Sequence, residues 1–134
     1  MGEDAFKYNA TLVHEAANRG HLECLEILVE HGAAVNGIDE GGSTPLHHAA
    51  YNKHVDSVIF LVQKGCPLDV INDDGMTAFT NAVRVGHVGI VRYLHRQGAI
   101  LHTRTSKHPL LSSSLEVLLL NMQLDTISPD IQEN

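Results

Sequence analysis

The 134-residue sequence contains no tryptophan and only two cysteines, and it lacks any long hydrophobic run. Cys24 and Cys66 are far apart and belong to no CxxC pattern, so the sequence encodes neither a disulfide framework nor a zinc site. The apolar clusters are too short to cross a bilayer, and the first ten residues, MGEDAFKYNA, lack the apolar core of a signal peptide. We therefore expect a protein of the cytoplasm or nucleus, with reduced thiols and no membrane partner.

Basic residues are also scarce, with nine Lys and Arg against 16 Asp and Glu, which gives a formal net charge of −7. A field of this sign repels a phosphate backbone, so nucleic acid is not an expected partner. The charge is uneven, because residues 1–40 are mostly acidic in their charged positions whereas residues 75–115 contain bases and no acid.

Three segments of the sequence align at a constant spacing of 33 residues. They read TLVHEAANRGHLECLEILVEHGAAVN from Thr11, TPLHHAAYNKHVDSVIFLVQKGCPLD from Thr44 and TAFTNAVRVGHVGIVRYLHRQGAILH from Thr77. One threonine, one alanine, one histidine, one leucine and one glycine column are identical in all three. This pattern resembles the ankyrin-repeat family, whose T-P-L-H-x-A signature is intact at residues 44–49.

The resemblance implies an all-α solenoid of helix-turn-helix pairs with projecting β-hairpin loops. It covers residues 10–104, after a lead-in at residues 1–9. The expected repeats are residues 11–43, 44–76 and 77–104. We expect residues 105–123 to form a degenerate fourth repeat or capping helix, and residues 124–134 to form a disordered acidic tail.

The shared columns have physical reasons. A threonine before the first helix of a repeat caps that helix through its hydroxyl, and Pro45 suits the first helical position because its missing N–H costs nothing there. Gly20 and Gly86 are expected to end first helices in a left-handed conformation. Lys53 occupies the same column, so we expect backbone strain at Lys53. In the second helices, apolar residues at three- and four-residue steps predict one buried stripe per helix.

Ten histidines raise the question of a metal site, because imidazole is a common metal ligand. Their spacing favours a structural role instead. His14 and His47 share one column, and His21, His54 and His87 share another, so we expect them to hydrogen-bond turn backbone between neighbouring repeats. The sequence contains no nucleophile elbow, phosphate-binding glycine loop or paired carboxylates. We therefore expect no metal, no cofactor, no catalytic residue and no enzymatic activity.

The resemblance implies that a partner protein binds the concave surface, which hairpin tips and the exposed ends of the first helices form. Tyr51 is the best anchor candidate and Arg84 the second, because aromatic and guanidinium side chains dominate binding energy at interfaces. The acidic tips favour a basic segment on the partner. Carried over by column, the candidate positions are Glu40, Gly41, Ser43, Asp73, Asp74 and Met76 on the tips, and Asn18, Arg19, Tyr51, Asn52, Arg84 and Val85 on the helices.

Asn36 holds the hairpin asparagine position of the first repeat, with Leu28 eight residues before it. In the ankyrin family this arrangement is a recurring target of iron- and 2-oxoglutarate-dependent asparaginyl hydroxylases, so the resemblance implies that Asn36 is a modification site. The alternative, in which Asn36 only hydrogen-bonds the hairpin, stays open. One added oxygen in the mass of the Asn36 peptide from cells distinguishes the two.

The resemblance favours a monomeric protein-interaction module that acts as an adaptor, inhibitor or scaffold. An alternative is the substrate-recognition or targeting segment of a larger enzyme, such as a ubiquitin ligase or a kinase. A third interpretation is a designed or truncated stack, although irregularities at Lys53, Pro67 and Thr80 favour a natural sequence.

Overall fold

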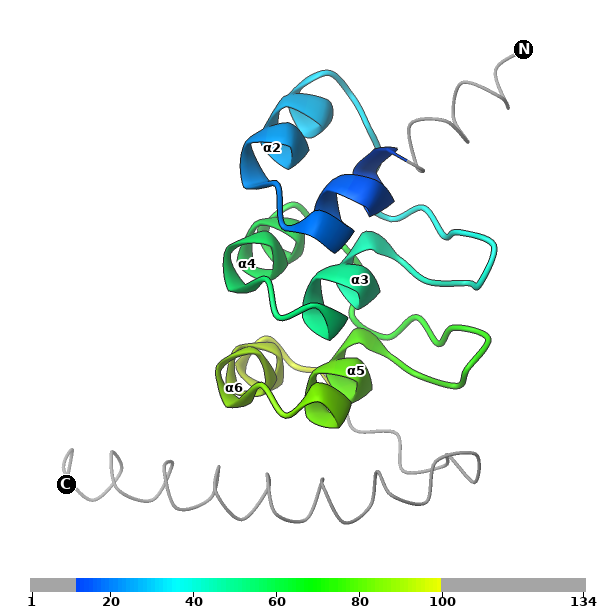
Figure 1. The fold of residues 1–134 in the computed structure, drawn as a ribbon, viewed down its shortest axis with the longest axis vertical. Coiled ribbons are helices and arrows are strands. Elements are labelled where there is room, and N and C mark those ends of the chain that lie inside the picture. The colour runs from blue at the N-terminus through cyan, green and yellow to red at the C-terminus, as the bar shows by residue number, and fades with distance from the viewer. Residues whose placement is uncertain (1–11, 100–134) are drawn as a thin grey trace, which may run out of the picture.

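The computed structural model describes residues 12–99. This part of the chain forms six helices and contains no strand, which confirms the predicted all-α fold (Figure 1). The lead-in, the cap, the tail and the last residues of the third repeat lie outside the described residues. The first helix covers residues 12–19, and the others are α2 (Leu22–Glu30), α3 (Pro45–Tyr51), α4 (Val55–Gln63), α5 (Ala78–Val85) and α6 (Val88–Arg96).

The helices are arranged in two columns (Figure 1). The first helix of each repeat, namely residues 12–19, α3 and α5, lies in an inner column, and α2, α4 and α6 form an outer column. The loops that join one repeat to the next project from the inner column, on the side away from the outer helices. The molecule therefore offers two different faces, one made by loops and inner helices and one made by outer helices.

The inner helices α3 and α5 begin with a threonine cap. Thr44 and Thr77 each accept a hydrogen bond from the backbone N–H three residues later, in capping boxes that His47 and Thr80 complete. Pro45 occupies the first position of α3, as predicted. These contacts fix where the polar loop stops and the helix starts.

The inner helices end at residues with left-handed backbone. Gly20 has φ of 71° and Gly86 has φ of 76°, as expected for helix ends of this kind. Lys53, in the same column, has φ of 65° and is the one non-glycine residue with positive φ among the described residues. The left-handed backbone expected at Lys53 is therefore confirmed, and the strain that it implies stays a prediction.

The core lies between the two columns and along the stack. On the outer helices the buried stripe consists of Leu25, Val58, Leu61, Ile90, Val91 and Leu94. On the inner helices small alanines are buried, and they allow α3 and α5 to make the most extensive contact among helices α2 to α6. The outer helices α2, α4 and α6 touch one another over much less of their length.

The projecting loops differ from the predicted β-hairpins, because none of their described residues is in a strand. Each loop is closed by a single backbone hydrogen bond across its neck, from Asp39 N–H to the Ser43 carbonyl at 2.9 Å and from Asn72 N–H to the Met76 carbonyl at 3.0 Å. A tight turn follows at once, so there is no length over which a ladder of strand hydrogen bonds can form.

Candidate functional site

Two projecting loops, the first loop (residues 37–43) and the second loop (residues 70–76), are built in the same way. In the first, Asp39 Oδ1 accepts the backbone N–H groups of Gly41 and Ser43 at 3.0 and 2.9 Å. In the second, Asn72 Oδ1 accepts those of Asp74 and Met76, both at 3.0 Å. A short polar side chain thus folds each loop around itself, which is the mechanism of an Asx turn.

The two loops are also joined to each other. The Asn72 amide donates to the Ser43 hydroxyl at 3.0 Å, and the Asp73 backbone N–H donates to the Gly41 carbonyl at 2.8 Å. A Cβ added at Gly42, where φ is 76°, would come within 3.1 Å of Asp73 Oδ1. The first loop therefore rests directly on the second, and the tips present one continuous edge.

Histidines tie the first two inner helices, residues 12–19 and α3, to the loop at the end of the same repeat. His14 Nε2 donates to the Ser43 carbonyl and His47 Nε2 to the Met76 carbonyl, each at 2.8 Å. His47 Nδ1 accepts the Thr44 backbone N–H at 3.0 Å, so the ring is neutral with its proton on Nε2. Burial lowers the pKa of His47 and outweighs the hydrogen bond to Met76. The predicted hydrogen bonds of histidines with backbone between neighbouring repeats are confirmed for His14, His47 and His54. His87 bonds instead to its own helix, and no such bond of His21 is present among the described residues.

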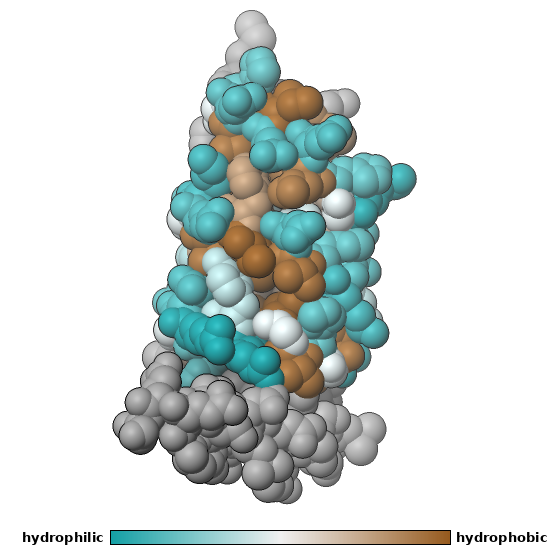
Figure 2. Space-filling model, turned by 90° about the vertical axis from the view of Figure 1, so that its left-hand side faces the viewer, coloured by the Kyte–Doolittle hydropathy of each residue, from teal (hydrophilic) through white to brown (hydrophobic). Residues whose placement is uncertain are grey.

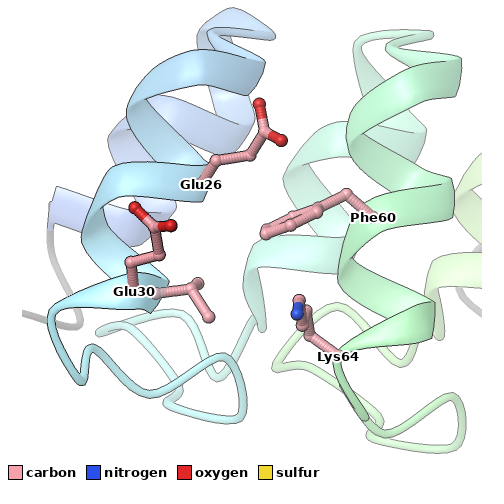
Figure 3. A pocket seen from close by; sticks show the side chains of 5 residues that line it. Glu26, Glu30, Phe60 and Lys64 are labelled. Atoms are coloured by element: carbon pink, nitrogen blue, oxygen red, sulfur yellow. The ribbon is translucent and has the colours of Figure 1, made fainter.

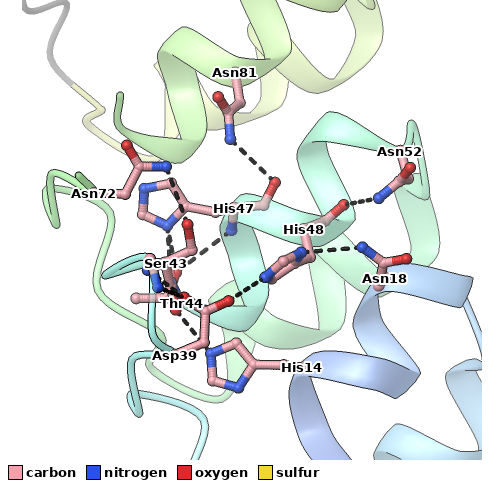
Figure 4. Close-up of polar contacts among 11 residues, drawn as sticks. His14, Asn18, Asp39, Ser43, Thr44, His47, His48, Asn52, Asn72 and Asn81 are labelled. Carbon is pink, nitrogen blue, oxygen red and sulfur yellow. Dashed lines mark hydrogen bonds and ion pairs between the residues drawn. The ribbon is translucent and has the colours of Figure 1, made fainter. Parts of the chain in front are cut away.

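His48 is adjacent to His47 but points toward the first loop (Figure 4). Its Nε2 donates to Asp39 Oδ2 at 2.7 Å, and its Nδ1 accepts the Asn18 side-chain amide at 3.0 Å. Burial alone would raise the pKa of Asp39, but hydrogen bonds from His48 and the Ser43 backbone, with the nearby imidazoles, lower it overall. The first loop is thereby anchored to two successive inner helices.

Comparison with protein families identifies the repeats. A family described as "Ankyrin repeats (3 copies)" matches residues 1–72, and one described as "Ankyrin repeats (many copies)" matches residues 54–95. The chain belongs to the ankyrin-repeat family. No individual curated protein matches it. Ankyrin repeats are in general protein-interaction modules, so the loops and inner helices are a candidate partner surface.

Most of the predicted partner-binding residues of this ankyrin stack are on its surface. Asn52 and Val85 are half-buried, and the Asn52 amide donates to the His48 carbonyl at 2.9 Å. Ser43 is half-buried and its hydroxyl is used between the loops. Arg19 is exposed and pairs with Glu15 at 2.8 Å. The exposed positions are Asn18, Arg19, Glu40, Gly41, Tyr51, Asp73, Asp74 and Arg84.

Met76 is wrongly placed on the predicted partner surface. Its side chain is 1% exposed and belongs to the buried apolar cluster, and its carbonyl accepts the hydrogen bond from His47. Ser43 and Met76 share a column, but the flexible apolar thioether fills core space whereas the serine hydroxyl bonds to Asn72. Met76 contributes to the fold and not to the surface.

Two residues that the column argument missed are prominent on the loops. Ile38 is 60% exposed and Ile71 is 53% exposed, and they occupy equivalent positions in the first and second loops. Each stands directly before the loop-folding residue, Asp39 or Asn72. An apolar residue at the same place in two polar loops, 33 positions apart, was the available sequence signal.

The described residues contain no evident catalytic arrangement. Every buried side-chain nitrogen or oxygen atom in residues 12–99 has a hydrogen-bond partner, and His47 uses both ring nitrogens to hold backbone. No group of three or more His, Cys, Asp or Glu in that range could hold a metal ion. None of the helices in that range has the length and apolar character needed to span a bilayer.

Asn36 lies between α2 and the first loop, and its side chain is exposed. None of the hydrogen bonds described for residues 12–99 involves this side chain, so hydrogen bonding within the loop does not explain the asparagine. Hydroxylation of Asn36 stays a prediction. Of the two thiols, Cys24 is exposed and Cys66 is buried, and burial raises the pKa of Cys66.

Proposed function

We propose that this chain binds a partner protein through the edge formed by its two loops and the exposed ends of its inner helices. The partner segment it fits carries apolar side chains flanked by basic ones. The chain acts by binding and not by catalysis. This role suits a free-standing adaptor, inhibitor or scaffold, and equally the targeting segment of a larger enzyme, because both use the same surface.

The exposed isoleucines of the loops are the observation that carries the proposal. Single exposed apolar residues are ordinary, but Ile38 and Ile71 recur at the same position on loops that rest on each other. Exposed acids, Glu40 on the first loop and Asp73 and Asp74 on the second, accompany them. The two isoleucines with the acids beside them are complementary to a partner segment that carries apolar and basic side chains.

Rigidity of the loops supports the same conclusion. Asp39, Asn72 and His48 fix the loops before any partner arrives, so little conformational entropy is lost on binding. Tyr51, which is 47% exposed at the end of α3, supplies a large contact area with few rotatable bonds. Arg84, at the end of α5, adds an exposed guanidinium.

Replacing both loop isoleucines tests the proposal. A partner is first recovered from cell extract on the immobilised chain and identified, and its affinity is measured by calorimetry. The double variant Ile38→Ser with Ile71→Ser should weaken binding at least tenfold, because each truncation removes an apolar contact worth about 1 kcal/mol or more. Tyr51→Ala with Arg84→Ala should also abolish most of the affinity.

The matched control is Ile27→Ser, which removes an isoleucine that is 56% exposed on the outer helix α2. Its thermal unfolding should resemble that of the loop variant, and its affinity for the partner should equal that of the unaltered chain. Binding that survives the loop changes but is lost with Ile27→Ser would place the partner on the outer helices and overturn the proposal.

A further inference from the structure

A hollow of about 190 Å³ lies between the outer helices α2 and α4 (Figure 3). These helices lie on the side of the molecule away from the loops (Figure 1). It exists because α2 and α4 touch over little of their length, while the inner helices pack closely. Phe60 projects from α4 toward α2. The lining residues are Glu26, Val29 and Glu30 on α2, and Phe60 and Lys64 at the α4 side.

The α2–α4 hollow has both apolar and charged lining residues, and its apolar ones are Val29 and Phe60. Both side chains are only half-buried, so part of their apolar surface is accessible. Figure 2 shows the outer-helix face, with hydrophobic residues in a band along its middle and hydrophilic residues on both sides.

The charges around the hollow are not balanced. Glu26 and Glu30 are both exposed, one helical turn apart, and neither makes an ion pair in the part of the chain that the structure describes. The third acid of α2 is Glu23, and this helix has no Lys or Arg. The Lys64 ammonium lies over the Phe60 ring, 5.7 Å from its centroid, and it also lines the hollow.

The size of the hollow limits what enters it. Sites for drug-sized molecules and cofactors have volumes of roughly 300 to 1,000 Å³, and this hollow is smaller, at about 190 Å³. It suits one apolar side chain of a protein segment. The two glutamates at its edge then lie within reach of a basic side chain on the same segment.

We propose that the α2–α4 hollow docks a short helix of a partner protein, at a surface separate from the loops. One leucine- or methionine-sized side chain of that helix packs against Val29 and Phe60. An arginine or lysine three or four positions away, about one turn along the partner helix, pairs with Glu26 and Glu30 at the edge of the hollow. The chain then holds two protein segments at once, one on each face.

A library of random 16-residue peptides displayed on phage, selected on the immobilised 134-residue chain, tests this assignment. Enriched peptides should contain an apolar residue three or four positions from Arg or Lys. A synthesised representative should shift the backbone amide NMR signals of α2 and the second half of α4. The double charge reversal Glu26→Lys with Glu30→Lys should weaken its binding at least tenfold.

The matched control is Glu40→Lys with Asp73→Lys, which makes the same change in charge at exposed positions of the two loops. It should leave binding of this peptide within twofold of that of the unaltered chain. The proposal is overturned if no peptide with the apolar and basic pattern is enriched. It is also overturned if the selected peptides shift signals of the loops, or if the loop reversal weakens binding as much as the reversal on α2.

Discussion

The ends of the inner helices show how one residue controls the contact between two repeats. A Cβ added at Gly20 would collide with the ring of His54, whose Nε2 donates to the Asn18 carbonyl at 3.0 Å. Lys53 carries such a Cβ, and the corresponding histidine, His87, turns instead to its own helix and accepts the Ile90 N–H at 3.1 Å. The glycine in this column thus serves both the left-handed backbone and the space for a bridging histidine.

Lys53→Gly should stabilise the protein by roughly 0.5 to 1.5 kcal/mol. The left-handed conformation costs a residue with a Cβ about 1 to 2 kcal/mol, and glycine avoids this cost. The greater conformational freedom of glycine in the unfolded chain offsets only part of the resulting stabilisation. Denaturant unfolding monitored by circular dichroism measures the difference.

The control for this measurement is Gly86→Ala, where φ is 76° and a Cβ would meet nothing within 4 Å. That variant should lose about 1 kcal/mol through the backbone alone. A Lys53→Gly variant that is less stable than the parent would mean that the strain at Lys53 is compensated by contacts of its side chain.

At the scale of elements, His47 links the start of α3 to the second loop, and it can do so only as a neutral ring with its proton on Nε2. Its Nδ1 must stay unprotonated to accept the Thr44 N–H, and its Nε2 proton holds the Met76 carbonyl. Burial depresses the pKa of His47 in the folded protein below the ordinary value of about 6.5. The unfolded chain therefore binds more protons than the folded chain below that pH, and folding stability falls.

The free energy of unfolding should accordingly decrease as the pH is lowered from 7.5 to 5, by about 1.4 kcal/mol for each unit by which the pKa of His47 is depressed. His47→Thr imitates the capping box of α5, where the Thr80 hydroxyl accepts the Thr77 N–H. This variant should be about 1 kcal/mol less stable at neutral pH, because it lacks the hydrogen bond to the Met76 carbonyl. Its free energy of unfolding should vary less between pH 7.5 and 5. An unchanged pH dependence would show that other groups cause it.

The elements themselves were predictable, because their signals are local. Threonine caps, Pro45 at the first turn, and left-handed ends at Gly20 and Lys53 follow from backbone chemistry within a few residues. The loops were less predictable. The column of Ser43 also holds Met76, and only tertiary packing decides whether such a side chain bonds to a loop or enters the core.

The candidate site was likewise predictable only where local sequence signals decide it. Family columns placed Tyr51, Arg84 and the loop acids on the surface, where they are exposed. The family columns missed Ile38 and Ile71. From the sequence alone, an apolar loop residue is as compatible with a buried position that anchors the loop as with an exposed one. The α2–α4 hollow had no sequence signal at all, since it depends on the spacing of two helices that belong to different repeats.

Over the whole molecule, close packing of the inner column and loose contact of the outer column produce two unlike surfaces. The inner side carries rigid loops that are hydrogen-bonded to each other and to α3. The outer side carries the α2–α4 hollow, which has apolar lining residues and, at its edge, acids that form no ion pair among the described residues. Each of the two proposed binding surfaces is built from more than one repeat, so both depend on the stacking of repeats.

Hydrogen–deuterium exchange of the full chain, alone and with the partner recovered on it, tests most directly that the loop edge is the principal binding surface. Amides of residues 38–43 and 71–76, and those around Tyr51 at the end of α3, should become protected on binding, while α6 should exchange as in the free chain. Protection confined to the outer helices, with the two loops unchanged, would contradict that assignment.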